Sequence, residues 1–430
     1  MLDNTHDINL VSWLGDCPDF PIQNLPIAIC KPQGADSFGA GIAIVDKILC
    51  LRKLYGKNLL TGKAAEALTF CQTDTLNEYM GLASEYRRAL RQALVDLLAE
   101  GSTQQEAISD CLYPLANAEY GMPCTIGDYT DFYTSIHHAT SVGKLFRPDN
   151  PLLPNYKWVP IGYHGRSSSI AVSPQNFVRP QGQTKAPDQA EPSLGDSKRL
   201  DYEMELGIFV GQANQLGQAV SIDSAEEHVF GICLFNDWSA RDLQAWEYQP
   251  LGPFLAKNFA STISPWIVSM DALAPYRVAF QRPADDPQPL PYLSSTENSE
   301  AGAIDIKVEV YLQTEKMAAE GIEPHRLSAS SFRHSYWTVA QMLTHHTVNG
   351  CNLQPGDLLG SGTQSGPTPE EAGSLLELSN AGKQSISLPS GETRTFLEDG
   401  DTVIMKGYCI AEGAKRIGLG ECIGKVLSNA

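Results

Sequence analysis

Residues 201–210 read DYEMELGIFV, and this stretch decides how the surrounding chain folds. Acidic and apolar side chains alternate through its first half, and an alternation with period two predicts a β-strand. Glu203 and Glu205 then point to the same face, about 7 Å apart at two rises of roughly 3.3 Å. Two anions this close favour one of two interpretations. Either the strand has a solvated outer face, or it forms part of a site for a hard divalent metal ion, which prefers oxygen ligands.

The stretch NDWSARDLQAWEY at residues 236–248 predicts a short helix. Asp237 is a residue type that caps helices. Arg241, Gln244 and Tyr248 follow it at spacings of four, three and four, which places them on one stripe. The stripe carries an anion, a cation, an amide and a phenol. A solvated helix face ordinarily carries Lys/Glu pairs instead, which favours a functional face. The pattern alone does not decide between the two interpretations, a functional face and an ordinary solvated face.

Residues 128–147 gather too many polar and titratable side chains for a core strand. The adjacent His137 and His138 are open to three interpretations: metal ligands, a general base, or a hydrogen-bonded structural pair. Three other segments are weaker candidates on their own. The polar and titratable side chains meant within residues 128–147 are Asp131, Tyr133, His137, His138 and Arg147. The three weaker segments are Gly162–Arg166, Lys257–Thr262 and the Gly-Ser-Gly-Thr run that ends at Thr363.

Composition excludes several classes of function. Among 430 residues, 50 Asp+Glu outnumber 31 Lys+Arg, and the formal charge of −19 repels nucleic-acid phosphates and anionic membranes. No phosphate-binding glycine motif follows a predicted strand, no apolar window reaches the roughly 18 residues of a membrane span, and Met1–Asp7 lack a signal-peptide pattern. The ten cysteines show no metal-ligand spacing and are expected to be reduced thiols. We therefore expect a soluble cytoplasmic protein.

Short β-branched runs closed by Gly, Pro, Asn or Asp predict a mainly β protein of the α+β class. Runs within residues 27–51 indicate a small barrel or meander. One clear helix is expected over residues 76–97, capped by Thr73 or Asp74 and stopped by Gly101.

Two further segments bear on the domain organisation. Residues 104–123 are expected to form a connection, which divides the chain into domains 1–120 and 121–430. Residues 281–302, rich in Pro, Asp and Ser, are expected to form a long surface loop within the second domain. Almost every chemically interesting side chain falls in that second domain.

Seven motifs, spread from end to end of the chain, together resemble the fumarylacetoacetate hydrolase family. They are long ungapped strings that include tryptophans, and are therefore more specific than the spacings above. The motifs are DFPIQNLP (19–26), TIGDYTDFY (125–133), GYHGR (162–166), NDWSARD (236–242), WEYQPLGPFLAK (246–257), THHTVNGCNL (344–353) and GSGTQSG (360–366).

The resemblance implies a small N-terminal SH3-like β-barrel domain, a large C-terminal β-roll catalytic domain and a homodimer. It also implies an enzyme that uses Ca²⁺ or Mg²⁺ to hydrolyse the carbon–carbon bond of 4-fumarylacetoacetate to fumarate and acetoacetate, the last step of tyrosine and phenylalanine catabolism. Two alternatives stay open: a related hydrolase of acylpyruvates or other β-diketones, and a metal-binding structural protein that has lost catalysis.

The resemblance also implies roles for individual residues. His138 would be the water-activating base, oriented by Glu377, and Arg241, Gln244 and Lys257 would stabilise the oxyanion. The implied metal site comprises Asp131, Glu203, Glu205, Asp237, Lys257 and Ser261, and the implied substrate contacts are Tyr133, Arg147, Tyr163, Gln244, Tyr248 and Thr363. The chain departs from the family pattern at Ala260 and Ser261, where Gly and Thr are expected. Ser keeps the hydroxyl, whereas the methyl of Ala260 restricts the backbone.

Overall fold

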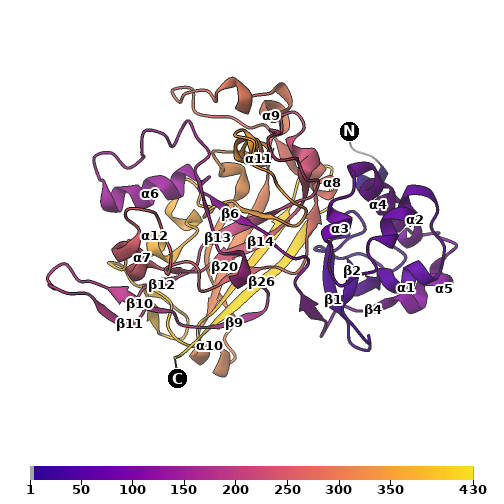
Figure 1. Ribbon diagram of the computed structural model, residues 1–430. Helices are drawn as coiled ribbons and strands as arrows, with labels where there is room; N and C mark the ends of the chain where they lie inside the picture. The colour runs from indigo at the N-terminus through magenta and orange to yellow at the C-terminus, as the bar shows by residue number, and fades with distance from the viewer. Residues whose placement is uncertain (1–3, 430) are drawn as a thin grey trace.

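The computed structural model describes residues 4–429 in two parts, which Figure 1 separates by colour. The indigo N-terminal part lies beside a larger part that runs from magenta through orange to yellow. Met1, Leu2 and Asp3, which begin the stretch without a signal-peptide pattern, lie outside the described residues, as does Ala430. Among residues 4–429, none of the helices combines the length and the apolar character that a membrane span needs.

The N-terminal part is built on a five-stranded antiparallel sheet in the order β4-β3-β2-β1-β5. Its strands are β1 (Ile27–Lys31), β2 (Gly39–Ile44), β3 (Lys47–Cys50), β4 (Leu112–Pro114) and β5 (Glu119–Gly121). The first three form the predicted meander. The prediction that residues 104–123 only connect two domains is wrong, because β4 and β5 form the two edges of this sheet. Strands of three residues are too short to show a period in the sequence.

Helices accompany this sheet and share its core. They are α1 (Leu51–Gly56), α2 (Gly62–Thr69), α3 (Asn77–Met80), α4 (Ser84–Leu98) and α5 (Gln105–Ile108). The single helix expected over residues 76–97 is wrong in its extent, because the chain breaks it into α3 and α4. Gly81 follows α3 and weakens helix propensity, and Ala83 has extended dihedrals of φ −56° and ψ 145°. Leu76 occupies the cap position of α3 without a side-chain hydrogen bond, so neither Thr73 nor Asp74 caps it.

The larger part is mainly β and consists of two sheets that pack around one core. One sheet has the order β7-β6-β22-β13-β14-β16-β8, with β17 also paired to β14; the other has the order β21-β20-β25-β26-β9. The first contains β6 (Tyr129–Phe132), β7 (Gly162–His164), β8 (Ile170–Val172), β13 (Met204–Val210), β14 (Val229–Asp237), β16 (Ser261–Ile263), β17 (Val268–Ser269) and β22 (Leu358–Gly360). The second contains β9 (Gln175–Val178), β20 (Ile306–Gln313), β21 (His325–Ser331), β25 (Thr402–Cys409) and β26 (Ile417–Leu427).

The main core lies where these two sheets meet. Strand β14 contacts β25 and β26, and Leu206, Leu234, Val308 and Met405 from the two sheets belong to one buried cluster. Strand β20 alternates buried and half-buried residues along its length, as expected for a sheet with one face on a core. Strands β13 and β14 are instead buried throughout. The mainly β class and the β-roll form of this part are therefore confirmed.

Short ladders and helices surround the two sheets. The ladders pair β10 (Gln181–Thr184) with β11 (Ser193–Asp196), β12 (Leu200–Asp201) with β15 (Ser239–Ala240), β18 (Arg277–Val278) with β19 (Ala303–Ile304), and β23 (Ile386–Ser387) with β24 (Thr393–Arg394). The helices are α6 (Ile136–Phe146), α7 (Arg241–Glu247), α8 (Met270–Leu273), α9 (Thr296–Ala301), α10 (Glu315–Ala319), α11 (Val339–Thr347) and α12 (Leu375–Leu378). The surface loop expected over residues 281–302 is therefore wrong at its end, where α9 forms and Leu293 is fully buried.

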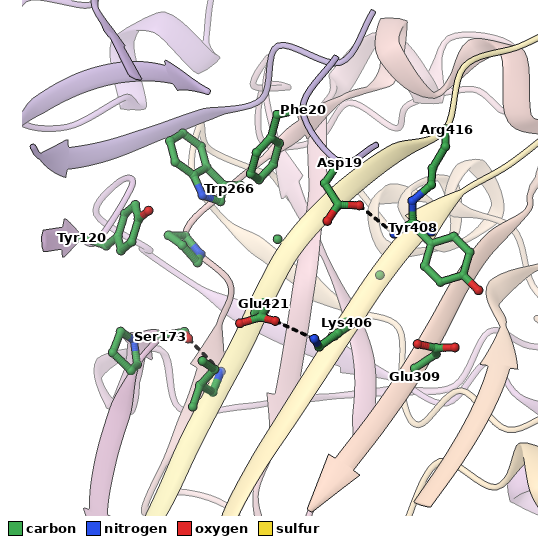
Figure 2. Close-up of a pocket in the computed structure, with 15 residues that line it drawn as sticks. Asp19, Phe20, Tyr120, Ser173, Trp266, Glu309, Lys406, Tyr408, Arg416 and Glu421 are labelled. Carbon is green, nitrogen blue, oxygen red and sulfur yellow. Dashed lines mark hydrogen bonds and ion pairs between the residues drawn. The ribbon is translucent and has the colours of Figure 1, made fainter. Parts of the chain in front are cut away.

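The motif at residues 19–26 fastens the N-terminal part to β26. The side chain of Asn24 donates to the carbonyl of Gly418 at 2.7 Å, and the backbone N–H of Gly418 donates to the carbonyl of Asp19 at 2.7 Å. Arg416 pairs with the Asp19 carboxylate at 2.7 Å, as Figure 2 shows. A cleft of about 510 Å³ opens beside this junction, and none of the predicted site residues lines it.

Candidate functional site

Three strands bring three carboxylates together in the first sheet of the larger part. Asp131 lies on β6, Glu205 on β13 and Asp237 at the end of β14. One carboxylate oxygen from each lies within 4.8 Å of the others, and all three side chains are buried. The strand predicted over residues 201–210 forms only as β13 (Met204–Val210), because Asp201 ends the separate strand β12 and Tyr202 and Glu203 lie between the two strands. Its interpretation as a solvated face is wrong, because β13 is buried along its whole length.

Strand β6 also overturns the expectation that residues 128–147 are too polar for a core strand. All four of its residues are buried, and it pairs with β22 on one side and β7 on the other. In the ladder with β22, Asp131 lies opposite Gly360. A Cβ atom on Gly360 would lie 2.7 Å from Asp131 Oδ1 and 3.2 Å from Glu205 Oε2. The missing side chain at Gly360 thus leaves the space into which two carboxylates extend.

This carboxylate cluster of Asp131, Glu205 and Asp237 fits a divalent cation. Asp131 Oδ1 and Glu205 Oε1 are buried and have no hydrogen-bond partner within residues 4–429. Burial, followed by repulsion from neighbouring carboxylates, raises the pKa of Asp131 and of Glu205 well above the usual range. A hard ion such as Ca²⁺ or Mg²⁺ prefers oxygen ligands of this kind and would neutralise the repulsion.

Glu203 lies beside the cluster and forms ion pairs with two cationic side chains. Its Oε1 pairs with Arg241 Nη1 at 2.7 Å, and its Oε2 accepts from Lys257 Nζ. Burial raises the pKa of Glu203, but attraction to Lys257 and Arg241 outweighs burial and lowers it. Glu203 therefore remains an ionised carboxylate, and each of its two oxygens is paired with a cationic side chain, Arg241 or Lys257.

The loop that begins at Lys257 supports Asp237. Lys257 Nζ donates to Asp237 Oδ2 at 2.6 Å, and Ser261 Oγ donates to Asp237 Oδ1 at 2.9 Å. Burial lowers the pKa of Lys257, but the carboxylates of Asp237 and Glu203 raise it by more, so the amine stays charged. A charged amine has no lone pair for a metal, so Lys257 contacts this site through the carboxylates. Ala260 is fully buried and is not among the residues with positive φ, so its methyl group fits without backbone strain.

Arg241 begins α7 and presents one unpaired end of its guanidinium group. Nε donates to Asp201 Oδ2 at 2.9 Å, and Nη1 donates to Gln244 at 3.3 Å besides pairing with Glu203. Nη2 is buried and has no acceptor within the described residues. Two fixed nitrogens and one unpaired nitrogen suit a group that binds an anion which forms during a reaction.

The prediction that Asp237 caps this helix is wrong. The cap position belongs to Ala240, without a side-chain hydrogen bond. Asp237 instead ends β14, and the short strand β15 (Ser239–Ala240) pairs with β12 before the helix begins. The carboxylate of Asp237 is thereby directed to Lys257 and Ser261 rather than to the helix amides.

His138 and Glu377 form a buried pair. Ser135 caps α6 and its hydroxyl accepts from the backbone N–H of His138. His138 Nδ1 lies 2.7 Å from Glu377 Oε2, which also accepts from Ser365 at 3.0 Å and from Ser374 at 2.8 Å. Burial raises the pKa of Glu377, but attraction to His138 and these hydrogen bonds outweigh it and lower the pKa. An ionised Glu377 places the proton of neutral His138 on Nδ1, which leaves the lone pair on Nε2.

His137, the neighbour of His138, lies in different surroundings. It is half-buried, and its ring centroid lies 6.1 Å from that of His334. Burial, and then the charge of His334, lowers its pKa. Of the two adjacent histidines, only His138 has a hydrogen bond to a carboxylate among the described residues.

The predicted substrate contacts differ in how close the structure brings them to these groups. The Tyr133 ring packs edge-on against His138 with centroids 5.5 Å apart, and Tyr163 OH donates to Asp237 Oδ2 at 3.4 Å. Thr363 is buried in the loop after β22. Tyr248 and Arg147 are exposed at the ends of α7 and α6. Arg147 donates to the carbonyl of Pro151 at 3.2 Å.

Sequence reasoning missed four residues that support the site. Gly360 and Ser365 belong to a motif quoted for the resemblance, and Asp201 belongs to the alternating strand, yet none had been assigned a role. Ser374 was visible as a helix cap, because Ser374 and Glu377 have the spacing of a capping box. In the structure, the Ser374 hydroxyl accepts from the Glu377 backbone N–H and donates to its carboxylate.

Two family models and several curated proteins match this chain. The model described as "Fumarylacetoacetase N-terminal" matches residues 23–123, and that described as "Fumarylacetoacetate (FAA) hydrolase C-terminal" matches residues 129–427. Fumarylacetoacetases from Rattus norvegicus and Caenorhabditis elegans are each 48% identical over 416 residues, which cover 95% of this chain and 96% of the relative. A solved structure of fumarylacetoacetate hydrolase from psychrophilic Exiguobacterium antarcticum covers 94% of this chain and 100% of its own, with 17% identity and a TM-score of 0.48.

Proposed function

This chain belongs to the fumarylacetoacetase family, and we propose that it hydrolyses the carbon–carbon bond of 4-fumarylacetoacetate to fumarate and acetoacetate. That reaction is the last step of tyrosine and phenylalanine catabolism. Relatives that carry the name fumarylacetoacetase match the chain over nearly their whole length. The structural observation that carries the proposal is the buried His138–Glu377 pair, with the unpaired Nη2 of Arg241 held in the same site.

His138 acts as the general base in this reaction. Its Nε2 takes a proton from a water molecule, whose oxygen then bonds to the carbonyl carbon next to the fumaryl group. Glu377 holds the ring in the required tautomer and stabilises the imidazolium that forms, as the carboxylate of a catalytic triad does. When the carbon–carbon bond breaks, the departing carbon keeps the electron pair and receives the proton that left the water. The atoms of one water molecule are thereby divided between fumarate and acetoacetate.

The negative charge that forms on the attacked carbonyl oxygen requires fixed donors. Arg241 supplies the unpaired Nη2, held in place by hydrogen bonds at Nε and Nη1. Gln244 accepts a hydrogen bond from Arg241, and Lys257 pairs with Glu203, which also pairs with Arg241. Both residues are assigned to the same oxyanion. Donors that are already oriented, in a site that excludes water, stabilise such a charge far better than water does.

Four buried carboxylates would hold Ca²⁺ or Mg²⁺: Asp131, Glu203, Glu205 and Asp237. Ser261 and Lys257 would support this site by donating hydrogen bonds to Asp237. Lewis acidity toward the β-diketone oxygens is the chemistry that such an ion supplies. Tyr133, Tyr163 and Thr363 are assigned to substrate contacts. Arg147 and Tyr248, which lie at the exposed helix ends, are assigned to the terminal carboxylates, which must be attracted locally against a net charge of −19.

Product analysis tests this function directly. The purified protein is mixed with fumarylacetoacetate, the loss of diketone absorbance is followed, and fumarate and acetoacetate are quantified. We expect equal amounts of both, loss of activity after treatment with a chelator, and recovery with Ca²⁺ or Mg²⁺. Cleavage of an acylpyruvate without cleavage of fumarylacetoacetate would contradict the proposal.

We also propose that the protein is a homodimer. The family resemblance supports a second copy as the partner. The end of α7 and the segment after it support an apolar contact, because Trp246, Leu251 and Phe254 are 43%, 96% and 67% exposed, and large exposed apolar groups mark interaction sites. Sedimentation should give twice the chain mass, and Leu251→Asp should weaken the dimer. A monomer at micromolar concentration would contradict this proposal.

The division into domains 1–120 and 121–430 and a cytoplasmic location are likewise proposals. A boundary near residue 120 is supported by the two family models, which leave only residues 124–128 between them. Strand β5 extends the N-terminal sheet to Gly121, one residue beyond the proposed division. The cytoplasmic location is supported by ten free cysteines, since the cytosol keeps thiols reduced. Limited proteolysis and fractionation of cells would test the two proposals separately.

A further inference from the structure

Asp201 is a buried carboxylate to which the mechanism above gives no role. It ends β12 and is fully buried, with 0% exposure. Its two oxygens accept four hydrogen bonds. Oδ1 accepts from the backbone N–H groups of Tyr202 at 2.9 Å and Leu375 at 2.8 Å, and Oδ2 accepts from the backbone N–H of Leu376 at 3.0 Å and from Arg241 Nε at 2.9 Å.

These donors belong to two different parts of the site. Leu375 and Leu376 form the first turn of α12, the helix on which Glu377 is the next residue. Arg241 carries the unpaired nitrogen assigned to the oxyanion. A single carboxylate therefore joins the segment that orients the base to the cation that faces the developing charge, although these segments lie far apart in the sequence.

We propose that Asp201 is a positioning residue that fixes the positions of Arg241 and Glu377 relative to each other for hydrolysis. The proposal rests on the function proposed above. Asp201 fixes Nε of Arg241 while Glu203 fixes Nη1 at 2.7 Å. Because the guanidinium is planar, two fixed nitrogens determine where the third one points. The bonds to Leu375 and Leu376 set the position of α12 from the same two oxygens.

Asparagine cannot reproduce this arrangement, although it has nearly the same shape. Each oxygen of Asp201 receives one N–H from α12 and one other donor, so the amide group of Asn would face two donors in either orientation. One α12 amide loses its acceptor in both cases. The first turn of α12 must then move away, and Glu377 moves with it.

The test compares Asp201→Asn with a matched control. Asp401 is also fully buried, binds Arg394 through both oxygens at 2.9 and 3.0 Å and accepts a backbone N–H at 2.9 Å. Neither Asp401 nor Arg394 bonds to any residue assigned to the site, among the described contacts. For each variant, kcat and KM are measured with fumarylacetoacetate, per mole of protein shown to be folded by its melting transition.

We expect Asp201→Asn to lower kcat by about 10²-fold, the usual result of a misplacement near 1 Å, with KM close to that of the wild type. Asp401→Asn should lower the melting temperature while kcat per folded molecule stays near that of the wild type. In an Arg241→Gln background, Asp201→Asn should cost less than it does alone, because both changes act on one unit. If Asp201→Asn folds poorly, Asp201→Glu provides the same comparison, since it keeps the charge but displaces the oxygens.

Two results would overturn the proposal: a kcat for Asp201→Asn near that of the wild type, or losses that multiply independently in the double variant. The proposed function is tested by a different measurement from the positioning role, because it depends on whether the wild-type protein cleaves fumarylacetoacetate. If the wild type does not, a crystal structure of Asp201→Asn decides. Displacement of Arg241 and α12 supports the positioning role, and an unchanged site overturns it.

Discussion

Replacing Gly360 with Ala tests whether the two carboxylates of Asp131 and Glu205 need the space beside β22. The added Cβ would lie 2.7 Å from Asp131 Oδ1, whereas ordinary contact begins at 3.4 Å, so that oxygen must move by about 0.7 Å. Metal sites tolerate ligand displacements of only about 0.2 Å. Overpacking of a core costs about 1–3 kcal/mol. We therefore expect weaker binding of Ca²⁺ or Mg²⁺, a lower melting temperature and a fall in kcat of about 10²-fold.

The assay is a titration of the melting temperature with Ca²⁺ and with Mg²⁺, accompanied by kcat at a saturating concentration of each ion. Gly195→Ala serves as the matched control. It lies on β11 with no heavy atom within 4 Å of the added Cβ among the described residues, and should behave as the wild type does. If Gly360→Ala bound metal with the wild-type midpoint and kept the wild-type kcat, the two carboxylates would not need this space.

The remaining predictions concern charges within the site. Arg241→Gln should lower kcat by about 10²-fold or more with a near-normal melting temperature, and Arg241→Lys should recover only part of it; early melting with kcat retained per folded molecule would instead make Arg241 structural. Glu203→Gln leaves Lys257 and Arg241 without their shared anion, so we expect a loss of about 3–5 kcal/mol in unfolding free energy together with reduced activity and reduced stabilisation by metal; normal values for all three would contradict the assignment. Because the folded-state pKa of Glu377 is lowered, its ionisation stabilises the protein above the ordinary pKa of about 4.3, and this contribution is lost as pH falls through the folded value. The melting temperature of Glu377→Gln should therefore depend less on pH in that acidic window than that of the wild type, and equal dependence would count against an ionised Glu377.

Patterns confined to one short segment predicted part of this architecture well. The alternation through residues 201–210 predicted a strand, which forms as β13 over Met204–Val210. The residue types of Glu203 and Glu205 predicted a need for positive charge nearby. The structure supplies such charge for Glu203 as Arg241 and Lys257. The apolar runs of residues 27–51 likewise predicted the meander of β1, β2 and β3.

Features that depend on distant partners were not predictable in the same way. Asp237 has the residue type of a helix cap, but pairing between β12 and β15 delays the helix and leaves its carboxylate in the site. The spacing of His137 and His138 could not distinguish their roles, because Glu377 lies 239 residues further along the chain from His138. Strands β4 and β5 were missed for a related reason: each is only three residues long and is stabilised by the neighbouring strand rather than by its own pattern.

The proposed function depends on the buried pair of His138 and Glu377, which would activate water for cleavage of fumarylacetoacetate. The most direct measurement compares kcat for His138→Ala and His137→Ala, with the amount of folded protein matched by melting. We expect kcat to fall by about 10²- to 10⁴-fold in His138→Ala, the usual contribution of a positioned general base, and to change much less in His137→Ala. Full activity in His138→Ala, or the larger loss in His137→Ala, would contradict this expectation.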